Sequence, residues 1–261
     1  MRTVKISEYI NFGLILRHLM GVKPGWTFLG ERKVENHIKW FFQYLKFLNL
    51  TVTLRASEEL QKFYDELVSK ADEKYNLNKE EAERLAKIVS TIRPTLEAEA
   101  QGNIAFIATD KRVDVNKLLY SIDTLMAPGI YASLPESAKY DFAECGKCIA
   151  FERPTAAAFH ILRGTEAVLR MFYCALVKKN RMSTLLWGPI VVSLKKRRVP
   201  PPIELLDNLD NIRRSFRNPT QHPEKIYDIQ EVQDLFWLCI DVINRMITYL
   251  ETKGLMQIDA T

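Results

Sequence analysis

The sequence lacks the residue patterns of several common kinds of active site. It has no glycine-rich phosphate loop, no His-Glu-x2-His zinc motif and no clustered acidic residues that would hold a pair of metal ions. These absences argue against a P-loop nucleotidase, a zinc protease of that class and a two-metal nuclease. If the chain is an enzyme, we therefore expect it to work without a cofactor.

Cysteine is also scarce. Four cysteines in 261 residues do not make a disulfide framework, so we expect a reducing, cytoplasmic compartment. Cys145 and Cys148 have the spacing of half a zinc knuckle or of a redox pair, but a structural zinc site needs four ligands. Cys174 and Cys239 stand alone in apolar stretches. We therefore expect all four to be small structural side chains, with no metal site.

Long hydrophobic runs are missing as well. No run approaches the ~20 residues that a membrane helix needs, so no membrane contact is expected. The N-terminal stretch is interrupted by Lys5, Glu8, Asn11 and Arg17, which argues against a secretory signal. Hydrophobic residues still make up 47% of the chain, which is enough for a folded core.

What the sequence does contain is helical periodicity, so the predicted fold class is all-α. The exception is a short apolar segment at 101–109, which could be a strand in a β-hairpin. Pro94 predicts a kink or break, and the Pro and Gly residues at 128–135 predict a domain boundary near 130–137. We expect a helical N-terminal domain (1–135) of unknown role and a four-helix C-terminal domain (136–261), with a connector between its second and third helices. The expected helices cover 4–20, 31–50, 57–75, 78–100, 115–126, 137–151, 155–178, 202–217 and 229–252.

The most informative segment is Arg217-Asn218-Pro219-Thr220-Gln221-His222. The helix before it is expected to end at Pro219, because proline lacks an N–H and restricts Asn218 to extended backbone. Arg213 lies one turn before Arg217 and shares its face. A new helix follows, with Asp228 as its cap. The motif is therefore predicted at a helix–loop–helix corner.

An Arg and a His at such a corner can cleave RNA without a metal. Arg217 offers a planar fork of donors that fits a phosphate. His222 can move a proton near neutral pH, since the unperturbed pKa of His is about 6.5. One group would take the proton of a 2′-hydroxyl, and the other would stabilise the charge that develops on the attacked phosphate.

Basic residues are concentrated around this motif. From Lys178 to Lys225 there are eleven Lys and Arg against four Asp and Glu, a local excess of about +7. Such an excess beside a phosphate site is typical of a nucleic-acid binder. Taken alone, the cluster 195–198 could equally be a solvated loop. The stretch includes Lys178, Lys179, Arg181, Lys195, Lys196, Arg197 and Arg198.

A four-helix unit with Arg217, Asn218 and His222 at the corner after its third helix resembles the HEPN superfamily. The likeness extends to two helices rich in small residues, 144–152 and 156–166, the second with Arg163 three residues before Glu166. The resemblance covers roughly 137–252 and leaves the N-terminal half unassigned.

The resemblance implies an all-α homodimer with metal-independent endoribonuclease activity. Two motifs would face each other across a two-fold interface to form one composite site. His222 would be the general base or acid, Arg217 the clamp on the phosphate, and Asn218 a positioning group. RNA would be the substrate, a toxin or anti-phage system the setting, and an antitoxin or regulatory protein a candidate partner.

Two alternatives remain open. Other HEPN proteins have lost catalysis and bind RNA, nucleotides or proteins, so the same corner could be a binding module. Alternatively, Arg217 could form a structural ion pair with Glu166, while His222 caps a helix or packs on Tyr227. One helical face carries His160, Arg163, Glu166 and Arg170. These residues would orient Arg217 and contact RNA, or they would form an ion-pair network that holds the bundle together.

Overall fold

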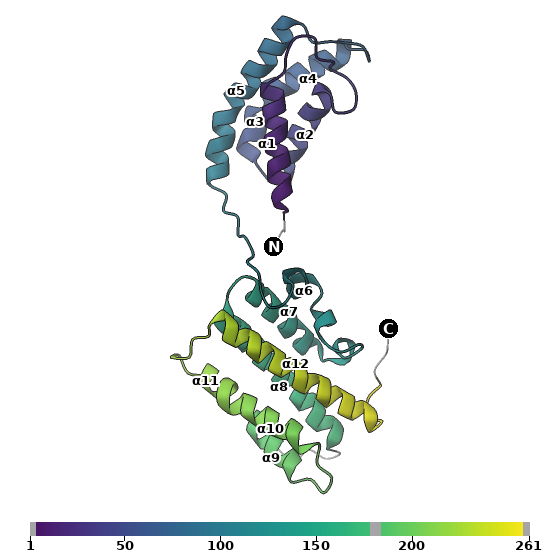
Figure 1. Ribbon diagram of the computed structural model, residues 1–261, viewed down its shortest axis with the longest axis vertical. Helices are drawn as coiled ribbons and strands as arrows, with labels where there is room; N and C mark the ends of the chain where they lie inside the picture. The colour runs from purple at the N-terminus through teal and green to yellow at the C-terminus, as the bar shows by residue number, and fades with distance from the viewer. Residues whose placement is uncertain (1–3, 178–183, 258–261) are drawn as a thin grey trace. The chain divides into compact units, whose positions relative to one another are not determined.

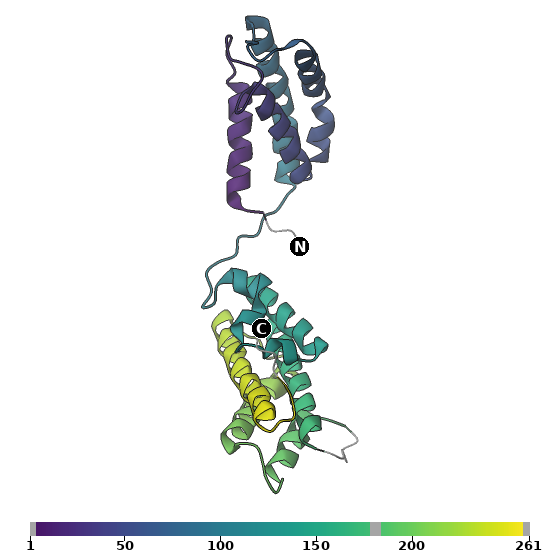
Figure 2. The ribbon, with the colours of Figure 1, turned by 90° about the vertical axis from the view of Figure 1, so that its right-hand side faces the viewer.

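The computed structural model describes residues 4–177 and 184–257. All regular elements in that part are helices, which confirms the all-α prediction. Thr27 and Asn76 form one isolated β-bridge. The chain divides into two compact units, an N-terminal unit of residues 1–106 and a C-terminal unit of residues 107–261 (Figures 1 and 2). None of the described helices is long and apolar enough to cross a membrane.

The N-terminal unit is a helical bundle around one apolar core. Helix α1 packs against α2 and α5, and α5 also packs against α3 and α4 (Figure 1). Phe41 of α2 and Phe63 of α4 are fully buried in this core. The helices are α1 (Ile6–Met20), α2 (Val34–Phe47), α3 (Thr51–Ala56), α4 (Glu58–Lys70) and α5 (Lys79–Gln101).

Helix α5 is set by its cap and its apolar face. Asn78 accepts from the backbone N–H of Glu81, and the Glu81 side chain accepts from the backbone N–H of Asn78, so both halves of a capping box are present. The helix continues through Pro94, which the sequence predicted as a kink or a break. Val89 and Leu96 are buried on either side of Pro94. Core packing therefore offsets the hydrogen bond that proline cannot make.

The expected strand at 101–109 is wrong. After α5 the segment 103–111 has no regular structure, and Ile104, Phe106 and Ile107 are 82%, 77% and 76% exposed. A strand needs a neighbouring strand to satisfy its backbone groups. No such neighbour is present among the described residues, so this apolar run does not form a hairpin.

The C-terminal unit is built around α8. Helix α8 packs against α7, α9 and α12, while α10 packs against α9 and α12 (Figure 1). The predicted four helices correspond to α7, α8, α10 and α12. The elements are α6 (Val115–Tyr120), η1 (Ile122–Leu125), η2 (Tyr131–Ser133), α7 (Glu136–Ala150), α8 (Pro154–Leu176), α9 (Trp187–Lys195), α10 (Ile203–Ile212), η3 (Arg213–Arg217), α11 (Asn218–Thr220) and α12 (Ile229–Thr252).

The division between the units falls after Phe106, earlier than the predicted boundary at 135. The segment from 113 to 134 belongs to the C-terminal core, because Leu118, Ile122 and Ile130 are buried in it. Gly146 on α7 explains the close packing, since a side chain there would overlap the backbone carbonyl oxygen of Leu118. The Pro and Gly residues at 128–135 therefore mark turns within one unit.

The predicted connector contains a helix, α9. Trp187 is buried and donates from Nε1 to the carbonyl oxygen of Leu209 on α10 at 3.0 Å. Ile190, Val191 and Leu194 are also buried, so the short apolar run is one face of a helix that packs on the core. Lys178, Lys179 and Arg181 of the basic stretch lie outside the described residues.

The helix before the motif does not end at Pro219. After α10 the backbone widens into one π-helical turn, η3, in which the N–H of Asn218 donates to the carbonyl oxygen of Arg213 five residues earlier. Asn218 keeps helical angles (φ −66, ψ −50), although it precedes proline, and the chain continues through α11. Single π turns inside α-helices are frequent at functional sites.

The end of α11 is fastened to the segment before α12. The Thr220 hydroxyl donates to the carbonyl oxygen of Phe216 at 2.6 Å. It has no second proton, so the buried Tyr227 hydroxyl, 2.6 Å away, donates to it. These bonds hold the Arg217 corner, residues 213–222, as an ordered part of the fold.

Candidate functional site

Arg217 faces α8 and meets Glu166. Its Nε and Nη2 atoms both lie 3.4 Å from Glu166 Oε2, while Glu166 Oε1 accepts from Arg170 Nη2 at 2.6 Å. The Arg217 side chain is 29% exposed and that of Glu166 is 12% exposed. Glu166 therefore bonds Arg170 closely and Arg217 loosely, which leaves part of the Arg217 guanidinium open to solvent.

Two hollows share Arg163, Glu166 and Arg217 along their walls. The Phe159 hollow has a volume of about 390 Å³ and is lined by Phe159, His160, Leu162, Thr220 and Gln221 besides the shared residues. The Tyr140 hollow, of about 520 Å³, is lined by Ser137, Tyr140, Asp141, Ala167 and Arg170 besides them. The predicted residues Arg163, Glu166, His160 and Arg217 thus come together at one place on the unit.

Asp141 organises the wall of this site, and the sequence did not predict it. It is 2% exposed, accepts from Arg163 Nε at 2.7 Å and lies 2.9 Å from Nδ1 of His160. Asp141 lies on the same helical face as the buried Ala138, Phe142 and Cys145. An acidic residue on an apolar face usually has a partner, and that was the signal available in the sequence.

Two exposed aromatic side chains border the hollows, and these were also missed. Tyr140 is 59% exposed and Phe159 is 48% exposed, each beside Arg163. Large exposed aromatic rings beside arginines are the arrangement on which unstacked nucleobases rest.

His222 and Asn218 lie at the same corner but do not line the hollows. Both side chains are exposed, and the backbone N–H of His222 donates to the carbonyl oxygen of Pro219 at 2.9 Å. Helix α11 ends at Thr220, so His222 lies beyond the helix, at a bend. One chain therefore presents Arg217 to its hollows, and its own His222 lines neither of them.

The remaining basic residues are not part of this site. Arg213 is paired with Asp210 at 2.9 Å and lies against Gly188 of α9. Lys195 is paired with Asp207, ten residues before Arg217, which along a helix is about 15 Å.

The rest of the basic cluster follows Lys195 in the chain. Lys196 and Arg198 are exposed, and Arg197 is partly buried, with no partner for its Nε among the described residues. The cluster 195–198 is thus a separate basic surface.

The four cysteines are free thiols that differ in exposure: Cys174 is exposed and Cys148 is half-buried. Cys145 and Cys239 are fully buried, and burial raises the pKa of the Cys239 thiol to about 12. Burial raises the pKa of the Cys145 and Cys148 thiols as well. No group of three His, Cys, Asp or Glu residues within 4–177 and 184–257 is arranged to hold a metal ion.

No protein-family model, no curated protein and no solved structure matches this chain. The function therefore has to be argued from the geometry of the Arg217 corner and its surroundings.

Proposed function

We propose that the chain is a cytoplasmic, metal-independent endoribonuclease of the HEPN kind, active as a homodimer. The supporting observation is that Arg217 lines both hollows whereas the exposed His222 of the same chain lines neither. The hollows are bordered by further arginines and by aromatic rings. A second copy, related by a two-fold axis, would bring its own His222 to the first copy's Arg217.

In this proposal the Arg163–Arg217 wall binds the RNA backbone. Arg163 is 65% exposed and Arg170 is 49% exposed, so both can reach a phosphate. A phosphate oxygen would replace the loose contact that Arg217 makes with Glu166, and Glu166 would stay bonded to Arg170. The bases on either side would stack on Phe159 and Tyr140.

The chemistry needs two proton carriers and one charge clamp. One His222 takes the proton of the 2′-hydroxyl, whose oxygen attacks the adjacent phosphorus. The bond to the 5′-oxygen breaks, and the His222 of the other copy donates a proton to that leaving oxygen. Arg217 stabilises the charge on the phosphate during transfer. The products are a 2′,3′-cyclic phosphate and a 5′-hydroxyl, and a toxin or anti-phage role would suit such an activity.

The alternative is a binding module without catalysis, and the Arg217–Glu166 pair favours it. An arginine already held by a carboxylate can be a structural residue, and its phosphate affinity is lowered by the neighbouring negative charge. In that case RNA would bind through Arg163, Arg170 and the aromatic rings, and His222 would have no role.

The test is RNA cleavage in EDTA by the full-length protein. Single-stranded and hairpin RNAs would be incubated with the parent protein and with His222→Ala, Arg217→Ala and Arg245→Ala. Arg245 is a matched control because it is an exposed arginine on α12, paired with Asp241 at 3.0 Å. We expect cleavage by the parent and by Arg245→Ala, none by the other two, and a cyclic phosphate end.

Two results would contradict the nuclease proposal. Cleavage that survives His222→Ala would exclude the proton-transfer role of that residue. Salt-sensitive RNA binding without cleavage, unchanged by His222→Ala, would establish the binding module instead. The dimer is checked separately by sedimentation, since a strictly monomeric active protein would rule out a composite site.

A further inference from the structure

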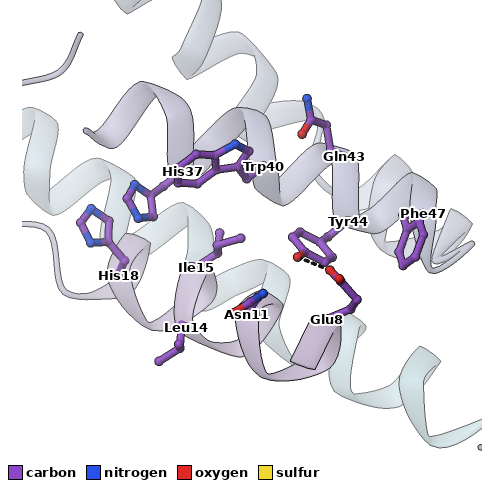
Figure 3. Close-up of a pocket in the computed structure, with 10 residues that line it drawn as sticks. All are labelled: Glu8, Asn11, Leu14, Ile15, His18, His37, Trp40, Gln43, Tyr44 and Phe47. Atoms are coloured by element: carbon purple, nitrogen blue, oxygen red, sulfur yellow. Dashed lines mark hydrogen bonds between the residues drawn. The ribbon is translucent and has the colours of Figure 1, made fainter. Parts of the chain in front are cut away.

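The N-terminal unit has a groove between α1 and α2, with a volume of about 750 Å³ (Figure 3). We call it the α1–α2 groove. The two helices run antiparallel, because Glu8 bonds Tyr44 at one end and His18 stacks on His37 at the other. Its walls are formed by Glu8, Asn11, Leu14, Ile15 and His18 of α1 and by His37, Trp40, Gln43, Tyr44 and Phe47 of α2.

The α2 wall of the groove is aromatic. Trp40, Tyr44 and Phe47 recur at helical spacing, and none of them is buried in the core below. Figure 3 shows Trp40 between the histidine pair and Tyr44, with Phe47 beyond Tyr44. Aromatic faces in this position attract cations, because the ring quadrupole is negative above the ring plane.

One end of the groove carries an acidic side chain. Glu8 Oε2 accepts from the Tyr44 hydroxyl at 2.6 Å. The hydrogen bond to Glu8 raises the pKa of Tyr44, so its hydroxyl remains a neutral donor. Glu8 Oε1 is a further acceptor at this end, and a carboxylate bonds most strongly to a charged donor.

The other end carries imidazole lone pairs. The rings of His18 and His37 stack with centroids 3.6 Å apart. His37 Nδ1 lies 2.8 Å from the carbonyl oxygen of Lys33, which can only accept, so in the neutral ring Nδ1 carries the proton and Nε2 is the acceptor. His18 Nε2 is enclosed and has no hydrogen-bond partner in the described part of the chain.

The groove is therefore rich in acceptors and poor in positive charge. None of its ten lining residues is Lys or Arg. Glu8 and His18 are ten residues apart on α1, so the acceptors at the two ends are separated by about 15 Å. A matching ligand is elongated, positively charged and equipped with N–H donors at both ends, with apolar segments between them.

We propose that the α1–α2 groove binds a linear polyamine. One terminal ammonium group bonds Glu8, and the other end donates to His37 Nε2. The methylene segments lie along Trp40, Tyr44 and Phe47, and an inner ammonium group rests on an aromatic face. This site lies wholly within the N-terminal unit and does not depend on the function proposed for the C-terminal unit.

The test is a calorimetric titration of the full-length, RNA-free protein with spermidine, and with hexylamine as a ligand with a single ammonium group. We expect saturable 1:1 binding of spermidine and much weaker binding of hexylamine. Glu8→Gln keeps an oxygen for the Tyr44 hydroxyl but removes the charge, and it should weaken spermidine binding by about 10- to 100-fold. Trp40→Leu should weaken it by about 2- to 30-fold through loss of the cation–aromatic contact.

The matched control is Glu83→Gln, since Glu83 is an exposed carboxylate of the same unit, 3.9 Å from Lys79 on α5. It should leave spermidine binding unchanged. Equal weakening by Glu8→Gln and Glu83→Gln would show non-specific surface binding and overturn the proposal. So would equal affinities for spermidine and hexylamine, or an absence of saturation. If circular dichroism shows that Glu8→Gln unfolds the unit, Trp40→Leu decides the question.

Discussion

Both units have open hollows beside packed helices, and the charged side chains that line them differ between the units. In the C-terminal unit, the hollows are lined by Arg163, Arg170 and Arg217 and by two acidic residues, Glu166 and Asp141. In the N-terminal unit, Glu8 lies among aromatic and imidazole rings, and none of the residues lining the groove is Lys or Arg. Helix packing of the same kind thus produces hollows with different side chains, for which we propose a polyanion in the C-terminal unit and a polycation in the N-terminal unit.

The units also differ in how closely their helices approach. On α7 of the C-terminal unit, Gly146 lies against the backbone of α6. A Cβ added to Gly164 of α8 would lie 3.2 Å from Cβ of Asp141 on α7. On α1 of the N-terminal unit, a Cβ added to Gly13 would meet nothing within 4 Å. The wall that holds Asp141 and Arg163 therefore rests on close helix contacts, whereas the α1–α2 groove borders an open helix surface.

The largest expected effect that separates the two units comes from removing His222, the proposed proton carrier of the C-terminal unit. His222→Ala should lower the single-turnover rate of RNA cleavage by about 10²- to 10⁴-fold, the usual contribution of a general acid or base. RNA affinity should change little, because the exposed His222 lines neither hollow. Spermidine binding by the N-terminal unit should be unchanged. An equal loss of RNA affinity and rate would show that His222 binds RNA and does not transfer protons.

The packing contrast is tested by two matched glycine substitutions. Gly146→Ala should destabilise the protein by about 1–3 kcal/mol, because the new methyl group would overlap Leu118 and lie 3.0 Å from Ile122 Cδ1. Gly13→Ala should stabilise α1 by about 0.5–1 kcal/mol, since alanine favours a helix interior and no atom opposes it.

Urea unfolding of the two glycine variants would measure both changes in the free energy of unfolding. A stabilising effect of Gly146→Ala would show that α6 does not pack on α7 as described. A destabilising effect of Gly13→Ala would mean that the exposed face of α1 is covered in solution.

The aromatic border of the C-terminal hollows should favour unpaired RNA. Phe159→Ala should weaken the binding of single-stranded RNA by about 1–3 kcal/mol, roughly 5- to 150-fold, and Tyr140→Ala should act in the same direction. Duplex RNA should be affected less, because its bases are already stacked. Trp237, which is 40% exposed on α12 and lines neither hollow, provides the control Trp237→Ala. Equal losses for single strand and duplex would exclude base stacking as the cause.

Much of the fold could be predicted because its signals are local. The cap at Asp228 and the apolar spacing after it predicted a helix at 229–252, and the Asp228 carboxylate does accept from the N–H groups of Gln230 and Glu231. Where tertiary packing overrides local rules, the prediction failed. The stretch between the second and third helices of the C-terminal domain was predicted as a connector, but burial of Trp187 and Ile190 produces α9 there. Pro219 suggested a helix end, but a π turn carries the chain past it.

The candidate site could be predicted only in part, for the same reason. Helical spacing on α8 grouped His160, Arg163 and Glu166, and the contact of Arg217 with Glu166 was one of the alternatives that the sequence left open. The role of Asp141 depends on how α7 faces α8, which the spacing within either helix does not determine. The sequence could not separate the cluster 195–198 from the Arg217 corner either, because residues that are close in sequence can lie on different surfaces of packed helices.

The smallest expected effect is a pH dependence confined to the N-terminal unit. Burial, and to a lesser degree the charge of His37, lower the pKa of His18 below its ordinary value of 6.5. As the pH falls below 6.5, His18 of the unfolded chain gains a proton, whereas the folded form stays neutral until its lower pKa is reached. The unfolded state then binds more protons, so the unit loses stability as pH decreases through this window.

Hydrogen exchange of the α1 and α2 amides at pH values above and below 6.5, corrected for the intrinsic rates, would report this loss locally. His18→Gln should flatten the dependence, since glutamine does not titrate. A dependence that persists in His18→Gln would assign the effect to His37 or to another group. A gain of protection at low pH would contradict the burial of a neutral imidazole and, with it, the lone-pair end of the α1–α2 groove.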